Sequence, residues 1–280
     1  MDAGLKHIVE DLGINSANLS IPTWSLQETL TGLAIVLGLY LTLVVKVLPT
    51  FMKNRQPYQL KNIMLAYNAF QVAFSVYVVF IYLRYIYRHN VITTRCPQGD
   101  DLQGVVSDIY PYFIAKHLDL LDTVFFVLRK KDNQITFLHL YHHTSMVTWT
   151  WLHFMHHPTD NFVVVGMLNS LVHVLMYAYY GISSLGPEYA KYIWWKKHLT
   201  KVQLIQFILV VSHLHFQQKF SPCPIPNFFH NFCMFLICSF FALFMNFYFS
   251  SYKSKSKKNR EEQKNGNVEF VVDERLMKTR

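Results

Sequence analysis

The stretch ITFLHLYHHTSMVTWTWLHFMHH, residues 135–157, carries six histidines in a run that is otherwise mostly apolar and aromatic. A membrane-spanning helix needs about 20 predominantly apolar residues, and this stretch is long enough to cross. Ionisable side chains are costly in hydrocarbon and normally face the interior of a helix bundle or a water-filled cavity. The stretch therefore predicts a membrane helix whose histidines face the interior of a helix bundle and have a function there.

The composition of the whole chain agrees with a membrane protein. Of its 280 residues, 52% are hydrophobic and only 15% are charged, whereas soluble domains average about 25% charged residues. Windows long and apolar enough to cross a bilayer occur about seven times. They lie at roughly 26–47, 63–87, 106–128, 135–156, 162–181, 198–217 and 228–250. The predicted fold is an all-α polytopic membrane protein of about seven transmembrane helices.

The two ends of the chain differ from this helical domain, which spans 26–250. Residues 1–25 lack the basic start and apolar centre of a cleaved signal, so we expect the first helix to be retained. Residues 251–280 form a basic tail that is expected to be disordered.

The distribution of Lys and Arg predicts the orientation in the membrane. Seven spans place the two termini on opposite sides, and the loops rich in Lys and Arg stay in the cytosol. Most basic residues outside the spans fall on the side of the C-terminus: Lys53, Arg55, Lys61, Arg129, Lys130, Lys131, Lys191, Lys196, Lys197 and the tail. The net charge of +9 therefore describes a cytosolic basic face for anionic headgroups or an anionic substrate, and nucleic acid is not expected as a partner.

Two cysteines and a sequon lie on the opposite, lumenal side. Cys96 and Cys223 fall in predicted outside loops, where an oxidising compartment permits a disulfide. We expect this bond to hold the outer helix ends together, as suits a cavity that opens only toward the cytosol. Asn18 begins a glycosylation sequon on the same side.

Polar side chains on four predicted helices lie at a common depth, in the cytosolic half of the membrane. The first histidine group, for example, lies roughly 6–12 Å in from the cytosolic end. The set consists of Lys116, Asp119, Asp122 and Thr123; His139, His142 and His143; Asn169, His173, Tyr177 and Tyr180; and Gln203 and Gln206. Such groups should face a shared cavity. The alternative is a purely structural Lys116–Asp119 ion pair with an interfacial belt of tyrosines.

The pattern H-x-x-H-H occurs twice in the opening stretch. His139, His142 and His143 form the first copy, and the second copy, residues 153–157, begins 14 residues later. On a continuous helix the copies are about 21 Å apart, so they cannot share a metal ion or a substrate atom. Only the first copy lies at the depth of the other polar groups. The second copy is expected to have an interfacial role at the outer end.

Four motifs stand in order along the chain: KHLDLLDT at 116–123, FLHLYHH at 137–143, HVLMYAYY at 173–180 and TKVQLIQ at 200–206. In order and spacing they resemble the ELO-type very-long-chain fatty acid elongases. The resemblance implies a 3-oxoacyl-CoA synthase of the endoplasmic reticulum membrane. Such an enzyme joins malonyl-CoA to a long-chain acyl-CoA, releases CO2 and CoA, and needs no cofactor. It also implies contact with the reductases and dehydratase of the elongation cycle. Self-association and acyl chain length stay open.

This resemblance assigns expected roles to the polar cluster. None of the four cysteines is predicted to reach the cytosolic half, so a histidine is expected to accept the acyl group. The expected catalytic residues are His142 and His173, supported by His139, His143, Lys116, Asp119 and Asp122. The expected substrate-binding residues are Thr123, Asn169, Tyr177, Tyr180, Gln203 and Gln206, together with Arg129, Lys130, Lys131, Lys196 and Lys197 for the CoA phosphates.

Two other function classes remain open. The H-x-x-H-H pattern also suits a histidine-ligated di-iron desaturase or hydroxylase, although such a site needs many histidines from several helices. The cytosolic half offers chiefly His117, His139, His142, His143, His173 and His198. A seven-helix receptor or transporter also fits the topology, but it gives no reason for the histidines to lie beside KHLDLLDT.

Overall fold

The computed structural model describes residues 25–223 and 225–254, and every regular element in this part of the chain is helical. The long helices are α2 (Leu26–Thr42), α4 (Lys61–His89), α5 (Asp100–Leu118), α6 (Leu121–Leu128), α7 (Phe137–His156), α8 (Val163–Ser184), α9 (Lys196–Phe220) and α10 (Asn227–Tyr248). The shorter elements are η2 (Leu43–Val47), α3 (Leu48–Met52), η3 (Asp132–Gln134), η4 (Asp160–Phe162), η5 (Pro187–Tyr192) and η6 (Phe249–Ser254). The all-α prediction is confirmed. The predictions for Asn18, for the rest of the N-terminal segment and for the tail beyond 254 lie outside the described residues.

Five helical segments of the described chain are long and apolar enough to cross a membrane, so the protein is a multi-pass membrane protein. They are Leu26–Met52, Lys61–His89, Asp160–Ser184, Lys196–Phe220 and Asn227–Ser251. The other two predicted windows, 106–128 and 135–156, coincide with α5–α6 and with α7. These helices carry KHLDLLDT and the histidines, which lower their mean hydropathy.

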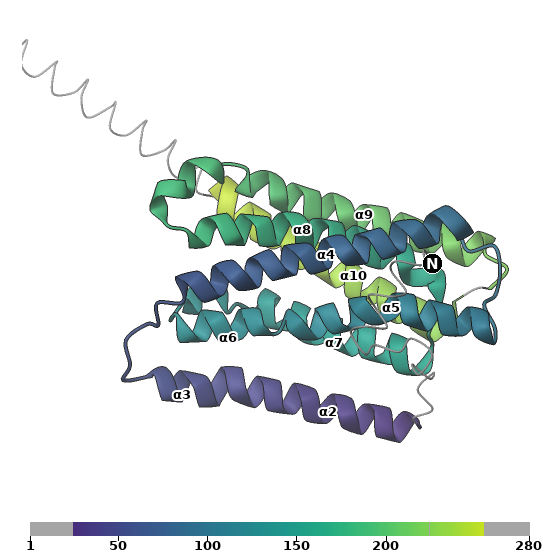
Figure 1. The fold of residues 1–280 in the computed structure, drawn as a ribbon, viewed down its shortest axis with the longest axis horizontal. Coiled ribbons are helices and arrows are strands. Elements are labelled where there is room, and N and C mark those ends of the chain that lie inside the picture. Colours follow the sequence, from purple (N-terminus) through teal and green to yellow (C-terminus); the bar gives the residue numbers. More distant parts are fainter. Residues whose placement is uncertain (1–24, 224, 255–280) are drawn as a thin grey trace, which may run out of the picture.

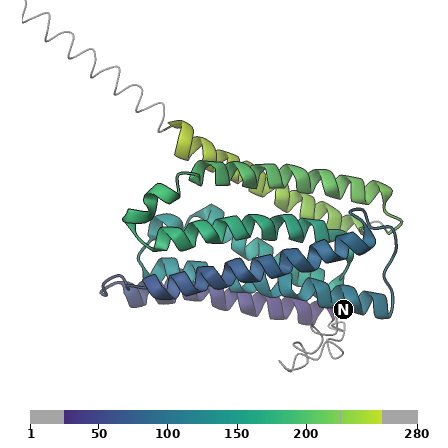
Figure 2. The same cartoon turned by 45° about the horizontal axis from the view of Figure 1, so that its top comes forward.

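Six of the helical units pack into a closed ring. Going around it, α4 contacts α8, α8 contacts α9, α9 contacts α10, α10 contacts α7, α7 contacts α5, and α5 returns to α4. The rod formed by α2, η2 and α3 lies outside the ring, with α2 against α7 and α3 against α6 (Figure 1). The helices stay aligned along one axis in a second view (Figure 2). Side chains that point inward from this ring share one interior.

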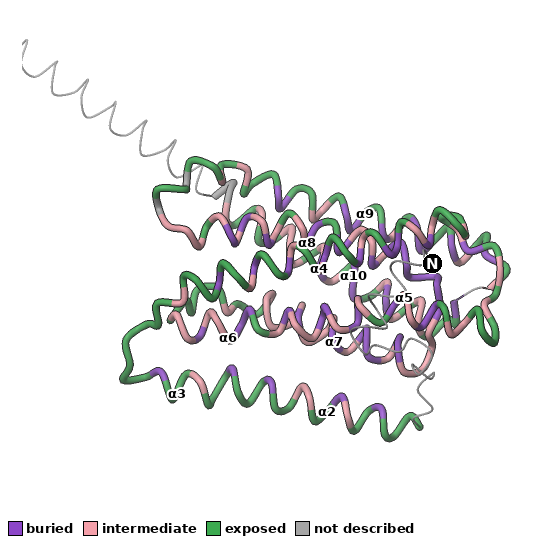
Figure 3. Tube along the Cα trace, in the orientation of Figure 1, coloured by how far each residue is buried: buried purple, intermediate pink, exposed green. Residues whose placement is uncertain are grey.

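The outward faces are apolar, as lipid requires. On α2 the side chains of Leu26, Ile35 and Leu39 are 60%, 56% and 68% exposed, and exposed positions dominate this helix in Figure 3. The buried apolar residues form two clusters on either side of α7. Val147 and Trp151 belong to the cluster with α4 and α5, whereas Trp149 belongs to the cluster with α9 and α10.

The third predicted helix, 106–128, is not continuous. α5 ends at Leu118 and α6 begins at Leu121. The amide of Leu120 donates to the carbonyl of His117 (3.2 Å), and that of Asp122 donates to the carbonyl of Asp119 (3.2 Å). Residues three apart eclipse one another in such a 3₁₀-like turn. The turn therefore brings Asp119 and Asp122 onto one face, whereas the sequence placed Asp122 beside the face of Lys116, Asp119 and Thr123.

A disulfide joins Cys96, which follows α4, to Cys223, which follows α9; their Cα atoms are 5.5 Å apart. The prediction of this bond is confirmed. The side-chain amide of Asn161 donates to the carbonyl of Cys223 (3.1 Å), which ties the bridge to η4 at the start of α8. The bond thus holds three helix ends together at one end of the ring.

Replacing Cys96 or Cys223 with Ser should lower the thermal midpoint of the purified protein by roughly 10 °C. The bridge closes a loop with a sequence separation of 127, and the chain-entropy treatment of such a loop gives about 4–5 kcal/mol. Cys238, which is free and exposed, supplies the matched control as Cys238→Ser. A linked peptide pair should appear in the non-reduced digest. Alkylation of both Cys96 and Cys223 in membranes isolated without reductant would contradict the bond.

Candidate active site

A buried ion pair lies at the level where α5 gives way to α6. Nζ of Lys116 is 2.9 Å from Oδ2 of Asp119, and the two side chains are 2% and 4% exposed. They are three residues apart on a helix, which is the spacing of neighbours on one face. A charge that is removed from water needs a partner and further hydrogen bonds, so the other contacts of Asp119 matter.

The second carboxylate oxygen of Asp119 accepts two hydrogen bonds from other helices. Nε2 of Gln71 on α4 donates to Oδ1 (3.0 Å), and the hydroxyl of Tyr177 on α8 donates to the same atom (2.8 Å). The Tyr177 hydroxyl is also 3.0 Å from Oδ2 of Asp122. One tyrosine proton thus lies between two carboxyl groups. Three ring helices are joined at this point.

His173 lies against the ion pair. Its Nδ1 is 3.5 Å from Oδ2 of Asp119, and its Nε2 is 3.5 Å from Nζ of Lys116. Both separations are long for hydrogen bonds, so a small movement of the ring decides which contact forms. The state of one imidazole nitrogen follows from the bond that the other makes. Asp119 and Lys116 are therefore placed to set the proton position on His173.

The first histidine group occupies the opening turns of α7. The hydroxyl of Thr136 accepts from the amide of His139 (3.2 Å), so a Thr N-cap starts the helix just before the histidines. The rings of His139 and His143 have centroids 4.3 Å apart, and the rings of His142 and His143 have centroids 5.4 Å apart. The His142 ring also packs against Phe240 of α10 (5.0 Å). His142 lies within electrostatic range of His173 and Lys116, so the structure brings both predicted catalytic histidines to the same region.

Thr123 connects this group to the helix outside the ring. Its Oγ1 lies 2.8 Å from Nε2 of His139 and 2.6 Å from the hydroxyl of Tyr40 on α2. Thr123 is fully buried, and Tyr40 is buried as well. A hydrogen-bonded line therefore runs from the peripheral helix to the imidazole of His139.

The remaining polar residues of the predicted set lie on α8 and α9. Asn169 accepts a hydrogen bond from the hydroxyl of Tyr112 through Oδ1 (3.0 Å). Tyr180 makes an edge contact with the ring of Tyr177 (centroids 6.2 Å apart). Gln206 is buried and Gln203 half-buried on α9. Their roles in binding stay predictions.

The five basic residues predicted to bind CoA lie at the same end of the ring as the histidines. Lys130 and Lys131 are exposed after α6, and Lys196 and Lys197 are exposed at the start of α9. Arg129 is half-buried and directs Nη1 to the sulfur of Met64 (2.8 Å). Four of the five predicted positions therefore present an ammonium group to solvent, whereas Arg129 points inward.

The second H-x-x-H-H copy differs from its predicted interfacial role. His153 is buried, its Nε2 lies 3.1 Å from the carbonyl oxygen of Thr159, and its ring contacts Trp149 and Phe162. His156 also has a buried ring nitrogen. The His153 ring turns inward because the chain folds back after α7, where Thr159 and Phe162 cover it. His156 and His157 are both half-buried, and the ring of His157 stacks on Phe229.

Sequence reasoning missed three residues that complete the cluster: Tyr40, Tyr67 and Gln71. The amide of Gln71 bonds Asp119 and the hydroxyl of Tyr67 (3.0 Å). A detectable signal was present for α4, because Asn68, Gln71 and Ser75 are polar residues at helical spacing within an apolar window. Tyr40 gave no such signal, since a tyrosine near a membrane boundary is common.

The geometry also bears on the di-iron alternative. Within residues 25–223 and 225–254, no group of three or more His, Cys, Asp or Glu side chains is arranged to hold a metal ion. The histidines instead contact hydroxyls, aromatic rings and the Lys116–Asp119 pair. The arrangement suits proton transfer and covalent catalysis by imidazole.

Comparison with known proteins agrees with this site. Residues 25–260 match the ELO family, described as the GNS1/SUR4 family. The chain belongs to this family. Very long chain fatty acid elongase 7 of Rattus norvegicus is 36% identical over 268 residues, which is 92% of this chain and 93% of that protein. Very long chain fatty acid elongase 1 of Homo sapiens is 38% identical over 239 residues, covering 82% and 85% of the two chains. The resemblance found in the four motifs is therefore confirmed.

Proposed function

We propose that the protein is the condensing enzyme of fatty acid elongation, a 3-oxoacyl-CoA synthase. It adds two carbons from malonyl-CoA to a long-chain acyl-CoA and yields 3-oxoacyl-CoA, CO2 and CoA. Membership of the ELO family assigns fatty acid elongation. The observation that carries the chemistry is the buried Lys116–Asp119 pair lying against His173, beside the His139–His143 group.

The first half-reaction is proposed to load the acyl group onto a ring nitrogen of His142 or His173. The lone pair of the nitrogen attacks the thioester carbonyl, the C–S bond breaks, and CoA leaves as the thiolate, which takes up a proton. The Lys116 ammonium, which is held in place by Asp119, would stabilise the oxyanion of the tetrahedral intermediate. Such a group acts strongly because the site is buried from water.

The second half-reaction consumes malonyl-CoA. Cleavage of its C–C bond releases CO2 and leaves an enolate, whose carbon attacks the acyl carbonyl. The C–N bond to histidine then breaks, and the ring regains its lone pair. The exposed lysines at positions 130, 131, 196 and 197 would hold the phosphates of both CoA substrates by charge.

Product analysis of the purified protein tests this proposal. With labelled malonyl-CoA and a panel of acyl-CoAs, the label should appear in 3-oxoacyl-CoA two carbons longer than the added acyl chain, with one CO2 released per product. A trapped species whose mass corresponds to the protein plus one acyl group, mapped to His142 or His173, would support the covalent step. Release of label without any 3-oxoacyl-CoA would refute the proposal.

Catalysis is further proposed to need no metal or cofactor. Treatment with EDTA or phenanthroline should leave the rate of 3-oxoacyl-CoA formation unchanged, because each step above uses only imidazole and ammonium groups of the chain. Metal content should be measured on the same sample. Stoichiometric iron or zinc, with activity lost on chelation and restored by that metal, would contradict this prediction.

The cellular setting is proposed from the family and from the charge pattern. The enzyme would reside in the endoplasmic reticulum membrane, with the N-terminus in the lumen and the basic end in the cytosol. Its product would pass to the reductases and the dehydratase of the elongation cycle. Protease protection of each terminus in sealed microsomes tests the orientation.

A further inference from the structure

Tyr40 lies on α2, outside the closed ring of helices that holds the candidate active site (Figure 1). Most side chains of the rod formed by α2, η2 and α3 are exposed, whereas Tyr40 and Val44 are buried on the side that packs against α6 and α7. The hydroxyl of Tyr40 is 2.6 Å from Oγ1 of Thr123 on α6. A polar group from outside the ring thus reaches a residue beside the first histidine group.

The hydroxyl of Thr123 has a polar neighbour on each side, Tyr40 at 2.6 Å and Nε2 of His139 at 2.8 Å. A threonine hydroxyl has one proton to donate. If that proton goes to Nε2, the oxygen of Thr123 can accept the proton of Tyr40, and both protons are used. The opposite order leaves the Tyr40 proton in need of another acceptor, and in the described part of the chain no third group bonds this hydroxyl. The order that satisfies all three groups runs from Tyr40 to Thr123 to His139.

This order fixes the state of the His139 ring. Because Nε2 accepts a hydrogen bond, the ring carries its proton on Nδ1. The lone pair of Nε2 is occupied and is not free to attack a thioester. The N-cap hydroxyl of Thr136 holds the backbone of His139, and the ring of Phe126 packs against its imidazole (centroids 5.2 Å apart). His139 is therefore a ring held in place, which leaves the acceptor role to His142 or His173.

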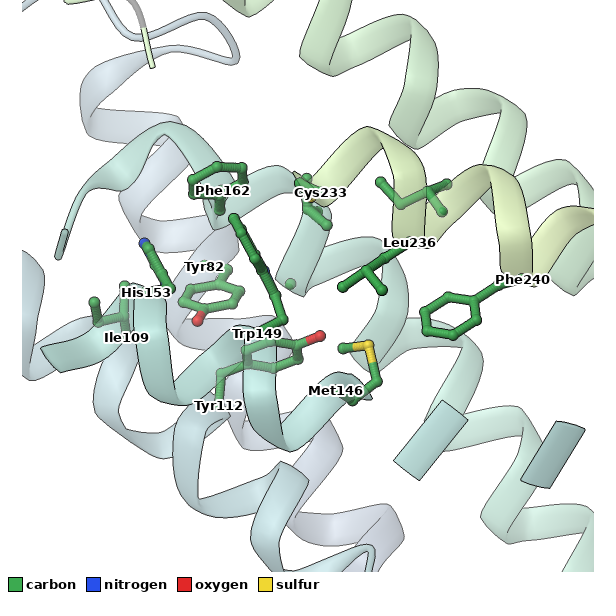
Figure 4. A pocket seen from close by; sticks show the side chains of 13 residues that line it. Tyr82, Ile109, Tyr112, Met146, Trp149, His153, Phe162, Cys233, Leu236 and Phe240 are labelled. Carbon is green, nitrogen blue, oxygen red and sulfur yellow. The ribbon is translucent and has the colours of Figure 1, made fainter. Parts of the chain in front are cut away.

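The His139 ring is the first of three imidazoles in contact, which lead to the interior of the ring of helices. The centroids of His139 and His143 are 4.3 Å apart, and those of His143 and His142 are 5.4 Å apart. The His142 ring packs against Phe240 (5.0 Å), and Phe240 lines the interior together with Met146 (Figure 4). Packed side chains have little free volume around them. A tilt of the His139 ring would therefore displace the other two imidazoles.

Tyr40 matters because a threonine in a helix has another acceptor for its proton. Its hydroxyl commonly donates to the backbone carbonyl four residues earlier, which for Thr123 is the carbonyl of Asp119. Three threonines of α7 make this bond: Thr144, Thr148 and Thr150. The hydroxyl of Thr123 instead lies between Tyr40 and His139. The bond from Tyr40 thus keeps the Thr123 proton directed at the imidazole.

We propose that Tyr40 and Thr123 are positioning residues for the condensation reaction. Together they hold His139 in one tautomer and one orientation, and through its ring they hold His143 and His142 in place. The inference rests on the proposed function, since it concerns the rate of that reaction. Thr123, which the motif resemblance predicted to bind substrate, has its hydroxyl fully buried and bonded within the protein. The helix outside the ring is then part of the catalytic unit.

The test compares variants that remove one hydroxyl each, with kcat expressed per folded protein after gel filtration in detergent. Thr123→Val keeps the side-chain shape but loses the bond to His139, so kcat should fall about 10-fold, the upper range for one hydrogen bond. Tyr40→Phe should lower kcat about fivefold, because Thr123 still donates to His139 part of the time. KM for acyl-CoA and malonyl-CoA should stay within about twofold, since neither residue touches substrate. Thr123→Ser retains the hydroxyl and should keep kcat within about twofold of the wild type.

The double variant Tyr40→Phe/Thr123→Val tests whether the two hydroxyls act in one line. Without the Thr123 hydroxyl, Tyr40 has no route to His139. The double variant should therefore lose about 10-fold in kcat, the same as Thr123→Val alone. Two independent effects would multiply to a loss of about 50-fold, and that result would overturn the inference.

Tyr85→Phe is the matched control. Tyr85 is also a buried tyrosine, and its hydroxyl donates to Asp160 (2.7 Å), about 20 Å along α8 from His173. This variant should lower the thermal midpoint as Tyr40→Phe does, yet keep kcat within about twofold. Wild-type kcat in folded Tyr40→Phe, equal losses in the Ser and Val variants of Thr123, or an equal loss in Tyr85→Phe would overturn the inference. If Thr123→Val is poorly folded, Tyr40→Phe and Thr123→Ser still decide. A wild type that forms no 3-oxoacyl-CoA would instead defeat the proposed function.

Discussion

Alanine at His142 or at His173 should lower the rate of 3-oxoacyl-CoA formation by at least about 10²-fold while the protein stays folded. His173 contacts both members of the buried ion pair, and His142 lies on the facing helix within electrostatic range. Both rings therefore offer a nucleophilic nitrogen in the region of Lys116. Steady-state assays with labelled malonyl-CoA, together with gel filtration in detergent, measure both parts of the prediction.

The controls come from histidines elsewhere in the chain. His215 is exposed on α9, and His157 is partly exposed at the end of α7; alanine at either should leave the rate within about twofold, as for most surface changes. His153→Ala is not a control, because His153 is buried and hydrogen-bonded to the carbonyl of Thr159. Full activity in His142→Ala, with activity lost in His157→Ala, would reverse the assignment of the two H-x-x-H-H copies.

The difference between the two copies shows what the sequence can and cannot predict. Helical rise alone separated them by about 21 Å and placed only the first with the polar cluster, and the structure agrees for His139, His142 and His143. The same arithmetic gives no information on how the chain turns back after α7. It therefore could not show that His153 would be covered by Thr159 and Phe162.

The side-chain cluster of the KHLDLLDT segment was predictable from the sequence, whereas its backbone conformation was not. Its charges and their spacing predicted a functional face, and Lys116 and Asp119 do form a buried pair. The 3₁₀-like turn between α5 and α6 was not predictable, because KHLDLLDT contains neither proline nor glycine to mark a break. The turn is stabilised instead by the hydrogen-bond contacts of the Tyr177 hydroxyl with Asp119 and Asp122. Propensity is a weak guide where such contacts decide.

Contacts across the ring explain why the cluster was only partly predicted. Gln71 is one amide in an otherwise apolar helix, and Tyr40 lies on a helix outside the ring. Gln71 and Tyr40 contact the polar cluster because α4 and α2 pack against the helices that carry it. This packing depends on the whole fold. By contrast, Cys96 and Cys223 were paired correctly, since the charge distribution alone placed both loops on one side.

Separating the structural from the catalytic work of the Lys116–Asp119 pair requires both single and double variants. Lys116→Met should destabilise the protein by about 3–5 kcal/mol, because it leaves the carboxylate of Asp119 buried without its cation. Asp119→Leu should cost a similar amount through the stranded ammonium of Lys116. Both single variants should also lose activity. The loss of activity in a single variant does not show a catalytic role, because a destabilised protein also loses activity by unfolding.

The double variant Lys116→Met/Asp119→Leu should regain most of the lost thermal midpoint and remain inactive. Replacing a buried ion pair by apolar residues of similar size is often neutral or stabilising. The groups that lose Asp119 keep other partners, since Tyr177 still contacts Asp122 and Gln71 still contacts Tyr67. A folded, inactive double variant would mean that the ammonium and carboxylate act on His173 and on the reacting carbonyl. A folded double variant with wild-type turnover would mean that the pair only joins helices, and the catalytic roles of Lys116 and Asp119 would be withdrawn.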